Sequence, residues 1–255
     1  MCIKAILLHE KISYRLIERV SIIVCMQPTY LPWIGYFDLI DQSDHFIFLD
    51  NVQFTKRSWQ QRNRIVTAKG LEWLTVPVKV KGRLKQLISH VAIDNDAFFY
   101  RKHLRAIELN YRKTPFFDIY FPQLESILSS CPLLCELNTI LIRWTAEQLG
   151  IQGRFYTSST LDVTGKRSEL LVNLCNVLGG NVYLSPQGSA EYLLEDKQLF
   201  DQNKINIMLH NYEHPSYRQI HEPFTPYATA LDLLFNEGGN SLAIIRSGRK
   251  QAGPL

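Results

Sequence analysis

The sequence predicts an α/β fold with a mainly parallel sheet flanked by helices, an antiparallel hairpin excursion and a helical middle block. Two observations indicate the parallel sheet: short apolar runs that are typical of buried strands, and intervening segments in which apolar residues recur at helical spacing. A third observation marks residues 96–149 as the helical block, because helical patterns follow one another there without a strand between them.

The first strand is expected at residues 21–27 (SIIVCMQ) and the second at residues 45–50 (HFIFLD), and both are apolar enough to be buried. Pro28 and Pro32 forbid a helix between them, because a proline inside a helix removes a backbone hydrogen bond and clashes with the preceding turn. Residues 33–42 place apolar side chains at positions 33, 36, 37 and 40, which predicts a short helix between the two strands.

A hairpin is predicted next, with strands at residues 63–67 (NRIVT) and 72–80 (EWLTVPVKV) joined by a turn at 68–70. Pro77 indicates an edge position or the end of pairing, because proline cannot donate a ladder hydrogen bond. Residues 87–93 (LISHVAI) alternate well enough to predict a further strand.

The helical block is expected to break at Thr114-Pro115 and at Cys131-Pro132. The order of strand and helix then resumes, with strands expected at 154–159, 182–186 and 205–210 and helices at 166–178, 189–194 and 227–236. No internal repeat or flexible linker divides the chain, so residues 21–248 are expected to form one domain. Residues 1–20 are expected to be an N-terminal extension and residues 249–255 a frayed tail.

The charge of the chain is unevenly distributed. The 255 residues carry a formal net charge of +4, and their 46% apolar and 20% charged content is that of a globular chain, which excludes disordered and fibrous classes. Residues 56–85 contain nine basic residues against the single acid Glu72, a net charge of +8, so the other 225 residues sum to −4. This basic segment favours an anionic partner.

Composition and motifs also indicate the cellular compartment of the protein and whether it binds a metal or a cofactor. No apolar run approaches the roughly 18 residues that span a bilayer, and the N-terminal residues lack the features of a signal peptide. Five cysteines in a chain of this length favour a reducing cytoplasm. Cys131 and Cys135 have no partner pair for zinc and no glycine-rich phosphate loop is present, so we expect neither a metal nor a cofactor.

The loop after the first predicted strand, residues 27–36 (QPTYLPWIGY), is one candidate binding segment. Ligands of open α/β sheets collect beyond the carboxyl ends of strands, and this loop runs into a helix N-terminus, which favours anions. Gln27, Tyr30 and Trp33 are its candidate substrate contacts. The alternative is that Trp33 and Tyr36 only pack the helix against the sheet.

Residues 50–64 (DNVQFTKRSWQQRNR), which follow the second predicted strand, form the other candidate segment. Asp50 at the end of that strand can orient a hydroxyl or accept a proton. The candidate substrate contacts are Gln53, Lys56, Arg57, Arg62, Asn63 and Arg64, and arginine in particular binds phosphate oxygens with two N–H groups. The alternative is a solvated loop whose arginines pair with nearby acids.

Several segments carry a resemblance to a known family. They are residues 27–37 (QPTYLPWIGYF), 46–54 (FIFLDNVQF), 62–65 (RNRI) and 73–78 (WLTVPV), with shorter matches at 102–104, 183–185, 192–193, 214–219 and 231–236. In this order they resemble the bacterial WbqC-like family from about residue 21 to residue 247. Asn51 departs from the family pattern, in which a second acid is common after Asp50, and this argues against a paired-carboxylate or metal role there.

The resemblance implies a role in surface-polysaccharide (O-antigen) synthesis, with transfer of a glycyl or another acyl group to an amino sugar as the expected reaction. The residues themselves favour an anionic ligand with a sugar or aromatic part, and a nucleotide-activated sugar fits both arguments. Acyl transfer needs a base that removes the amine proton, and the candidate bases are Asp50, His103 and His214. For His103 the alternative is a polar histidine on a helix face.

Two other functions stay open at this point. The order of the first two strands is similar to that of adenylating nucleotidylyltransferases, although residues 28–36 lack the paired histidines of those enzymes. A nucleic-acid-binding module would instead use the basic segment 56–85, with Trp59 and Trp73 as stacking platforms. We expect a small anionic molecule, rather than nucleic acid, to be the partner.

Overall fold

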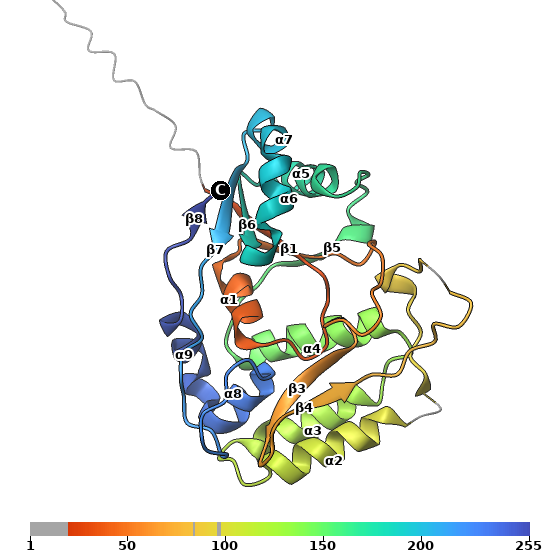
Figure 1. The fold of residues 1–255 in the computed structure, drawn as a ribbon, viewed down its shortest axis with the longest axis vertical. Coiled ribbons are helices and arrows are strands. Elements are labelled where there is room, and N and C mark those ends of the chain that lie inside the picture. Colours follow the sequence, from red (N-terminus) through yellow and green to blue (C-terminus); the bar gives the residue numbers. More distant parts are fainter. Residues whose placement is uncertain (1–19, 84, 96–97) are drawn as a thin grey trace, which may run out of the picture.

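A six-stranded sheet forms the centre of the molecule in the computed structural model, which describes residues 20–83, 85–95 and 98–255 (Figure 1). Its order is β5-β2-β1-β6-β7-β8, and all neighbours are parallel except β7 and β8. The strands are β1 (Ile22–Met26), β2 (His45–Phe48), β5 (Phe155–Thr157), β6 (Val182–Pro186), β7 (Asn206–His210) and β8 (Gly253–Pro254). The predicted mainly parallel sheet is confirmed, whereas the predicted extension at residues 1–20 lies outside the described residues except for Val20.

Helices cover both faces of the sheet. Ile23 and Cys25 of β1 pack in one core with α5 (Ser168–Val177), α6 (Ala190–Glu195) and α7 (Lys197–Gln202). Val24 points the other way, into a larger core that contains α1 (Ile34–Gln42), α2 (Phe99–Tyr111), α3 (Phe117–Leu128), α4 (Leu134–Gln148), α8 (Ala230–Glu237) and α9 (Ser241–Ser247). Because both faces are covered, the strands are near-continuous apolar runs, which is the signal that predicted them.

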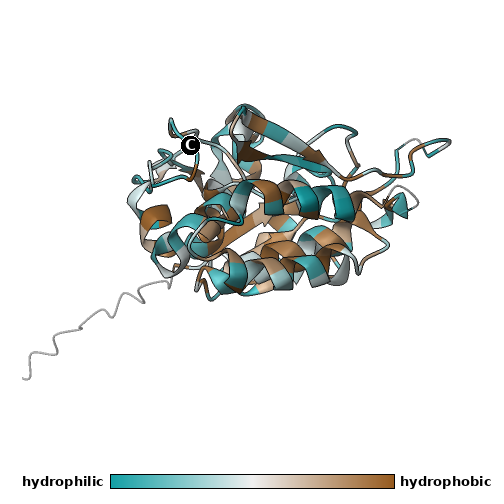
Figure 2. Cartoon of the chain, turned by 90° about the horizontal axis from the view of Figure 1, so that it is seen from below, coloured by the Kyte–Doolittle hydropathy of each residue, from teal (hydrophilic) through white to brown (hydrophobic). Residues whose placement is uncertain are grey.

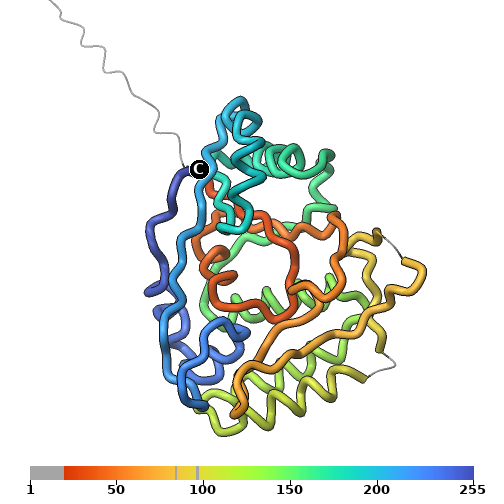
Figure 3. Tube along the Cα trace, in the orientation of Figure 1, coloured from red at the N-terminus to blue at the C-terminus, as the bar shows by residue number. Residues whose placement is uncertain are grey.

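The predicted hairpin is a separate two-stranded antiparallel sheet, made of β3 (Arg62–Thr67) and β4 (Gly70–Thr75). It lies against the helical block, where the Val66 amide donates a hydrogen bond of 2.9 Å to the Tyr111 hydroxyl. The trace in Figure 3 follows the chain from the hairpin into α2–α4 and then back to the sheet. In Figure 2 the hydrophobic segments, coloured brown, lie mostly towards the middle of the molecule. The outer helices also carry hydrophilic stretches, coloured teal.

The prediction of a strand at residues 87–93 is wrong. Ile88–His90 form a 3-10 turn, and the flanking residues make only isolated bridges, one of them between Val78 and Ile93. The alternation reflects burial of Ile88, Val91 and Ile93 in the larger core without a neighbouring strand to form a ladder.

Residues 249–255, which were predicted to be a frayed tail, are instead paired with the sheet. Leu209 and Met208 of β7 pair with Gly253 and Pro254, which form β8. The guanidinium of Arg249 binds the fully buried carboxylate of Asp38 on α1. Backbone pairing and an ion pair therefore hold a segment whose sequence has no apolar periodicity.

The sheet has a topological switch point between β1 and β6. The chain leaves β1 towards β2 on one side and leaves β6 towards β7 on the other, so the connections diverge at the carboxyl ends of these two neighbours. Ligands of open α/β sheets bind in the crevice at such a point. Within the described ranges, the structure contains no helix with the length and apolar character needed to cross a membrane.

Candidate functional site

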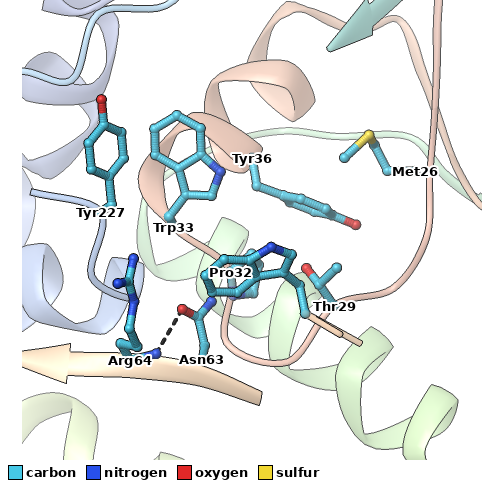
Figure 4. A pocket seen from close by; sticks show the side chains of 9 residues that line it. Met26, Thr29, Pro32, Trp33, Tyr36, Asn63, Arg64 and Tyr227 are labelled. Carbon is cyan, nitrogen blue, oxygen red and sulfur yellow. Dashed lines mark hydrogen bonds between the residues drawn. The ribbon is translucent and has the colours of Figure 1, made fainter. Parts of the chain in front are cut away.

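Two adjoining cavities open at the carboxyl edge of the sheet. The aromatic cavity, of about 310 Å³, is lined by Met26, Thr29, Pro32, Trp33, Tyr36, Trp59, Asn63, Arg64 and Tyr227 (Figure 4). The switch-point cavity, of about 280 Å³, is lined by Cys25, Met26, Gln27, Thr29, Leu49, Ser58, Trp59, Gln60, Leu171, Tyr183, Pro186, Ser189 and Tyr192. The two cavities share Met26, Thr29 and Trp59, and neither lining contains an acidic side chain.

Backbone hydrogen bonds bring three distant segments together around the aromatic cavity. The Ala230 amide at the start of α8 donates to the Pro32 carbonyl at 2.8 Å, and the Thr229 amide donates to the Arg64 carbonyl on β3 at 2.9 Å. The loop between β1 and α1 (residues 27–33, here called the proline loop), the hairpin and α8 are thus fixed relative to one another. Figure 4 shows Arg64 and Tyr227 beside Trp33, with Met26 at the other end of the cavity.

Two buried asparagines hold the proline loop itself. The side-chain amide of Asn138 on α4 donates to the carbonyls of Pro28, at 3.0 Å, and of Gln60, at 2.7 Å. The side-chain amide of Asn63 donates to the Leu31 carbonyl at 2.7 Å. Loop carbonyls that would otherwise be buried without partners are satisfied in this way, which keeps the cavity walls in place.

Arg62 and Arg64 lie against a pair of tryptophans. The guanidinium carbon of Arg64 is 5.6 Å from the ring centre of Trp59 and 5.3 Å from that of Trp73, and that of Arg62 is 4.2 Å from Trp73. Among the described residues neither arginine forms an ion pair with a carboxylate. Of these two predicted substrate contacts, Arg64 lines the aromatic cavity and Arg62 lies beside it on Trp73, and neither charge is neutralised by a carboxylate among the described residues.

His214 lies behind Trp33, which lines the aromatic cavity, and itself lines neither cavity. The two rings are stacked, with centres 6.0 Å apart and planes 17° apart, and Tyr227 packs against both. Nδ1 of His214 donates to the Pro215 carbonyl at 2.9 Å, and its buried Nε2 has no hydrogen-bond partner among the described residues. Burial lowers the pKa of His214, while backbone hydrogen bonds act in the opposite direction.

Asp50 occupies the predicted position just beyond β2, but serines from the end of β5 surround it. Its Oδ1 accepts hydrogen bonds from the Ser158 hydroxyl and the Ser159 amide, both at 2.9 Å, and its Oδ2 accepts from the Ser159 hydroxyl at 2.6 Å. The carboxylate is buried and lines neither cavity. Its contacts join the ends of β2 and β5.

Tyr30 and His103 lie together in the larger core. The Tyr30 hydroxyl is 2.8 Å from Nδ1 of His103 on α2, and both residues are buried. Burial lowers the pKa of His103 to about 4, and a hydrogen bond to the Thr75 backbone acts in the opposite direction. This pair joins the proline loop to α2, and neither residue lines a cavity.

The other predicted contacts are dispersed. Gln27 lines the switch-point cavity, and its Oε1 accepts a hydrogen bond of 2.7 Å from the side-chain amide of Gln60. Gln53, Lys56 and Arg57 are exposed on the loop between β2 and β3 and line neither cavity. Gln27, Trp33, Asn63 and Arg64 are therefore the predicted substrate contacts that the fold brings to the two cavities.

Sequence reasoning missed most of the switch-point cavity. Tyr183 comes from β6, Ser189 from the turn that follows it and Tyr192 from α6, and Tyr227 comes from the segment before α8. The segments 183–185 and 192–193 belong to the family resemblance, and that was the signal that could have found them. In the described part of the chain, no cluster of three or more His, Cys, Asp or Glu side chains is placed to hold a metal ion.

Comparison with known proteins gives the family. An uncharacterized protein of Mycobacterium tuberculosis, Rv1507c, is 35% identical over 237 residues, which covers 89% of this chain and 99% of that protein. No solved structure matches the chain. The sequence profile described as the WbqC-like protein family matches residues 27–244, which include every lining residue of both cavities except Cys25 and Met26. The chain therefore belongs to the WbqC-like protein family.

Proposed function

We propose that this protein binds a nucleotide-activated amino sugar at the aromatic cavity and transfers a glycyl or another acyl group to it, as a step of surface-polysaccharide (O-antigen) synthesis. The observation that carries the proposal is the guanidinium of Arg64, which lies in an acid-free wall among aromatic rings and has no carboxylate partner among the described residues. Such a charge suits a phosphate group, which arginine binds through two N–H groups.

The aromatic walls suit the sugar of such a ligand. Trp33 and Tyr227 line the cavity with their rings 5.6 Å apart, and Tyr227 is half exposed at the cavity mouth. The apolar face of a sugar ring packs well against aromatic side chains that carry a polar tip. A phosphate at Arg64 would direct the attached sugar towards Trp33 and Tyr227.

The transfer step requires a base, and we assign this role to His214, whose ring stacks on Trp33 of the cavity lining. In the reaction the sugar amine attacks the carbonyl carbon of an acyl thioester or ester, the new N–C bond forms, and the bond to the leaving group breaks. Nε2 of His214 takes the amine proton, because Nδ1 already donates to the Pro215 carbonyl. Asp50 and His103 are given no catalytic role, since structural partners occupy both.

A thermal-shift screen tests the binding proposal, because a ligand that binds the folded state raises the melting temperature. The panel contains nucleotide sugars, free nucleotides, acyl thioesters and short oligonucleotides. We expect the largest shift from nucleotide sugars, and we expect Arg64→Gln to abolish it. Lys81→Gln is the matched control, because Lys81 is an exposed cation of the same basic segment that lines neither cavity. Equal shifts from every polyanion, or equal losses in both variants, would reject the proposal.

One observation favours a second candidate function. Trp59 and Trp73 are exposed side by side next to two arginines, which is also the arrangement of a single-stranded nucleic-acid platform. That function predicts tight binding of oligonucleotides with a steep loss of affinity as salt rises. The oligonucleotide arm of the same screen, repeated at two salt concentrations, distinguishes it from the transferase.

A further inference from the structure

Trp59, in the loop that precedes the hairpin, and Trp73 on β4 form an exposed aromatic pair that the proposed transfer chemistry does not use. We propose that Trp59 and Trp73 are the platform on which the nucleobase of the ligand stacks, that Arg62 and Arg64 bind its phosphates, and that the sugar alone enters the aromatic cavity. This inference rests on the proposed function. It assigns each part of a nucleotide sugar to named side chains.

The exposure of the pair is the first argument. Trp59 is 49% exposed and Trp73 is 45% exposed, whereas Trp144 is buried and Trp33 is partly buried. The two exposed rings are 5.4 Å apart at an interplanar angle of 38°, so they form one apolar surface rather than two isolated ones. Contiguous exposed apolar patches on soluble proteins commonly mark binding sites.

The position of the arginines is the second argument. Arg64 pairs directly with Trp73 across the hairpin and Arg62 lies two residues away on β3, so the three side chains share one face. Arg64 also lines the aromatic cavity. Trp73 lies outside the cavity lining, whereas Arg64 and Trp59 belong to it, so the platform adjoins the cavity at these two residues. A nucleotide sugar with its base on Trp73 and its phosphates at Arg64 would place its sugar in the cavity.

The size of the platform favours a single nucleotide over a nucleic-acid strand. A strand needs successive aromatic side chains for successive bases along a basic groove. Here there are two tryptophans beside Arg64, and Trp59 and Arg64 themselves line the cavity of about 310 Å³ together with Tyr227 and Trp33. The cavity suits the sugar end of one ligand, and the platform ends there.

Calorimetric titration with UDP, GDP and inorganic pyrophosphate isolates the contribution of the base, because the three probes share the diphosphate. Stacking on an aromatic side chain is worth about 1–3 kcal/mol per base, so we expect the wild-type protein to bind UDP and GDP about tenfold or more tightly than pyrophosphate. Trp73→Leu should reduce this ratio to near one and leave the affinity for pyrophosphate unchanged. Trp59→Leu provides a second variant, since its side chain is also exposed.

Three controls make the outcome decisive. Arg64→Gln should weaken all three probes alike, and Ser189→Leu, which partly fills the switch-point cavity, should weaken none. An Arg64-dependent affinity that is equal for pyrophosphate and the nucleotides would overturn the platform while the phosphate clamp stands. Loss of the base contribution in Ser189→Leu, but not in Trp73→Leu, would place the base at the switch point instead.

Tighter binding of hexathymidylate than of dTDP would reassign the platform to nucleic acid. No binding of any probe would reject both proposals.

Discussion

The guanidinium carbon of Arg64 lies 5.6 Å from the ring centre of Trp59, and this contact places a cation that lacks a carboxylate partner among the described residues where two cavities meet. Trp59 belongs to the lining of both cavities, and Arg64 belongs to that of the aromatic cavity. A cation that stacks on an aromatic ring keeps its N–H groups free for an anion at the ring edge. The arrangement is therefore ready to bind phosphate without first breaking an ion pair.

The proposed base sets the pH dependence of transfer. Burial lowers the pKa of His214 below its usual value of 6.5, so its neutral form, which accepts the proton, prevails at neutral pH. We expect the rate of acyl transfer from a thioester to a UDP-amino sugar, after correction for titration of the sugar amine, to fall only below pH 6.5. His214→Gln should lower the rate by about 10²-fold or more, as is typical when a general base is lost. A rate that is unchanged in His214→Gln, or one that increases with acid, would exclude this role.

The buried histidine His103 makes folding stability depend on pH. Its pKa of about 4 in the folded protein lies below the value of 6.5 for an unperturbed histidine. Below pH 6.5 the unfolded chain takes up a proton that the folded protein does not accept, so the free energy of unfolding falls until about pH 4. The difference amounts to about 3 kcal/mol at most.

Urea unfolding of wild-type protein and His103→Gln between pH 7 and pH 4 measures this contribution. Glutamine keeps an acceptor for the Tyr30 hydroxyl and cannot titrate, so the stability of the variant should depend less steeply on pH. Parallel curves for the two proteins would show that His103 is not the group responsible.

The C-terminal segment should contribute to the stability of the whole domain. Arg249 binds the fully buried Asp38, whose Oδ2 also lies 2.7 Å from His210 Nε2 and accepts a hydrogen bond of 2.6 Å from the side-chain amide of Gln42. Arg249→Met removes the guanidinium and leaves a buried carboxylate with less compensation, which should cost about 3 kcal/mol of unfolding free energy. Arg246→Met is the control: Arg246 is 54% exposed where it pairs with Asp41, and surface pairs contribute about 1 kcal/mol or less. Equal losses for the two variants in urea unfolding would contradict the importance of the buried pair.

A methyl group at Gly35 should displace a wall of the aromatic cavity. A Cβ atom at this position would lie 2.3 Å from the Trp33 ring, which is too close for any real contact, so the indole must move. We expect Gly35→Ala to cost about 1–3 kcal/mol and to weaken nucleotide-sugar binding, both by overpacking. Gly239→Ala, where a Cβ atom would meet nothing within 4 Å, is the matched control for titration and unfolding. Unchanged affinity in Gly35→Ala would show that Trp33 does not contact the ligand.

The sheet was predictable because its strands are covered on both faces and therefore apolar throughout. The parts that were not predictable depend on contacts between distant residues. β8 has only two residues and is held by pairing with β7 and by the ion pair of Arg249 with Asp38, which lies 211 residues earlier. The buried alternation at residues 87–93 resembles a strand, but with the other described residues it makes only isolated bridges.

The candidate site likewise has a part that the sequence predicts and a part that depends on contacts between distant residues. Arg64 and Trp33 were predicted from the density of cations and aromatics near strand ends, and both line the aromatic cavity. Asp50 was chosen by the same criterion, yet Ser158 and Ser159, more than 100 residues later in the chain, satisfy its oxygens. A single sequence shows that a polar residue is near a strand end but not which distant partner satisfies it, and Tyr227 was missed for the same reason.

Calorimetric titration of wild-type protein, Arg64→Gln and Lys81→Gln with UDP-glucosamine tests the central claim most directly. Loss of a charge-assisted hydrogen bond costs about 1.5–3 kcal/mol, so Arg64→Gln should weaken binding by about 10- to 100-fold, whereas Lys81→Gln should bind as the wild type does. Equal affinity in all three proteins, or an equal loss in both variants, would contradict the assignment of Arg64 as the residue that holds the phosphate.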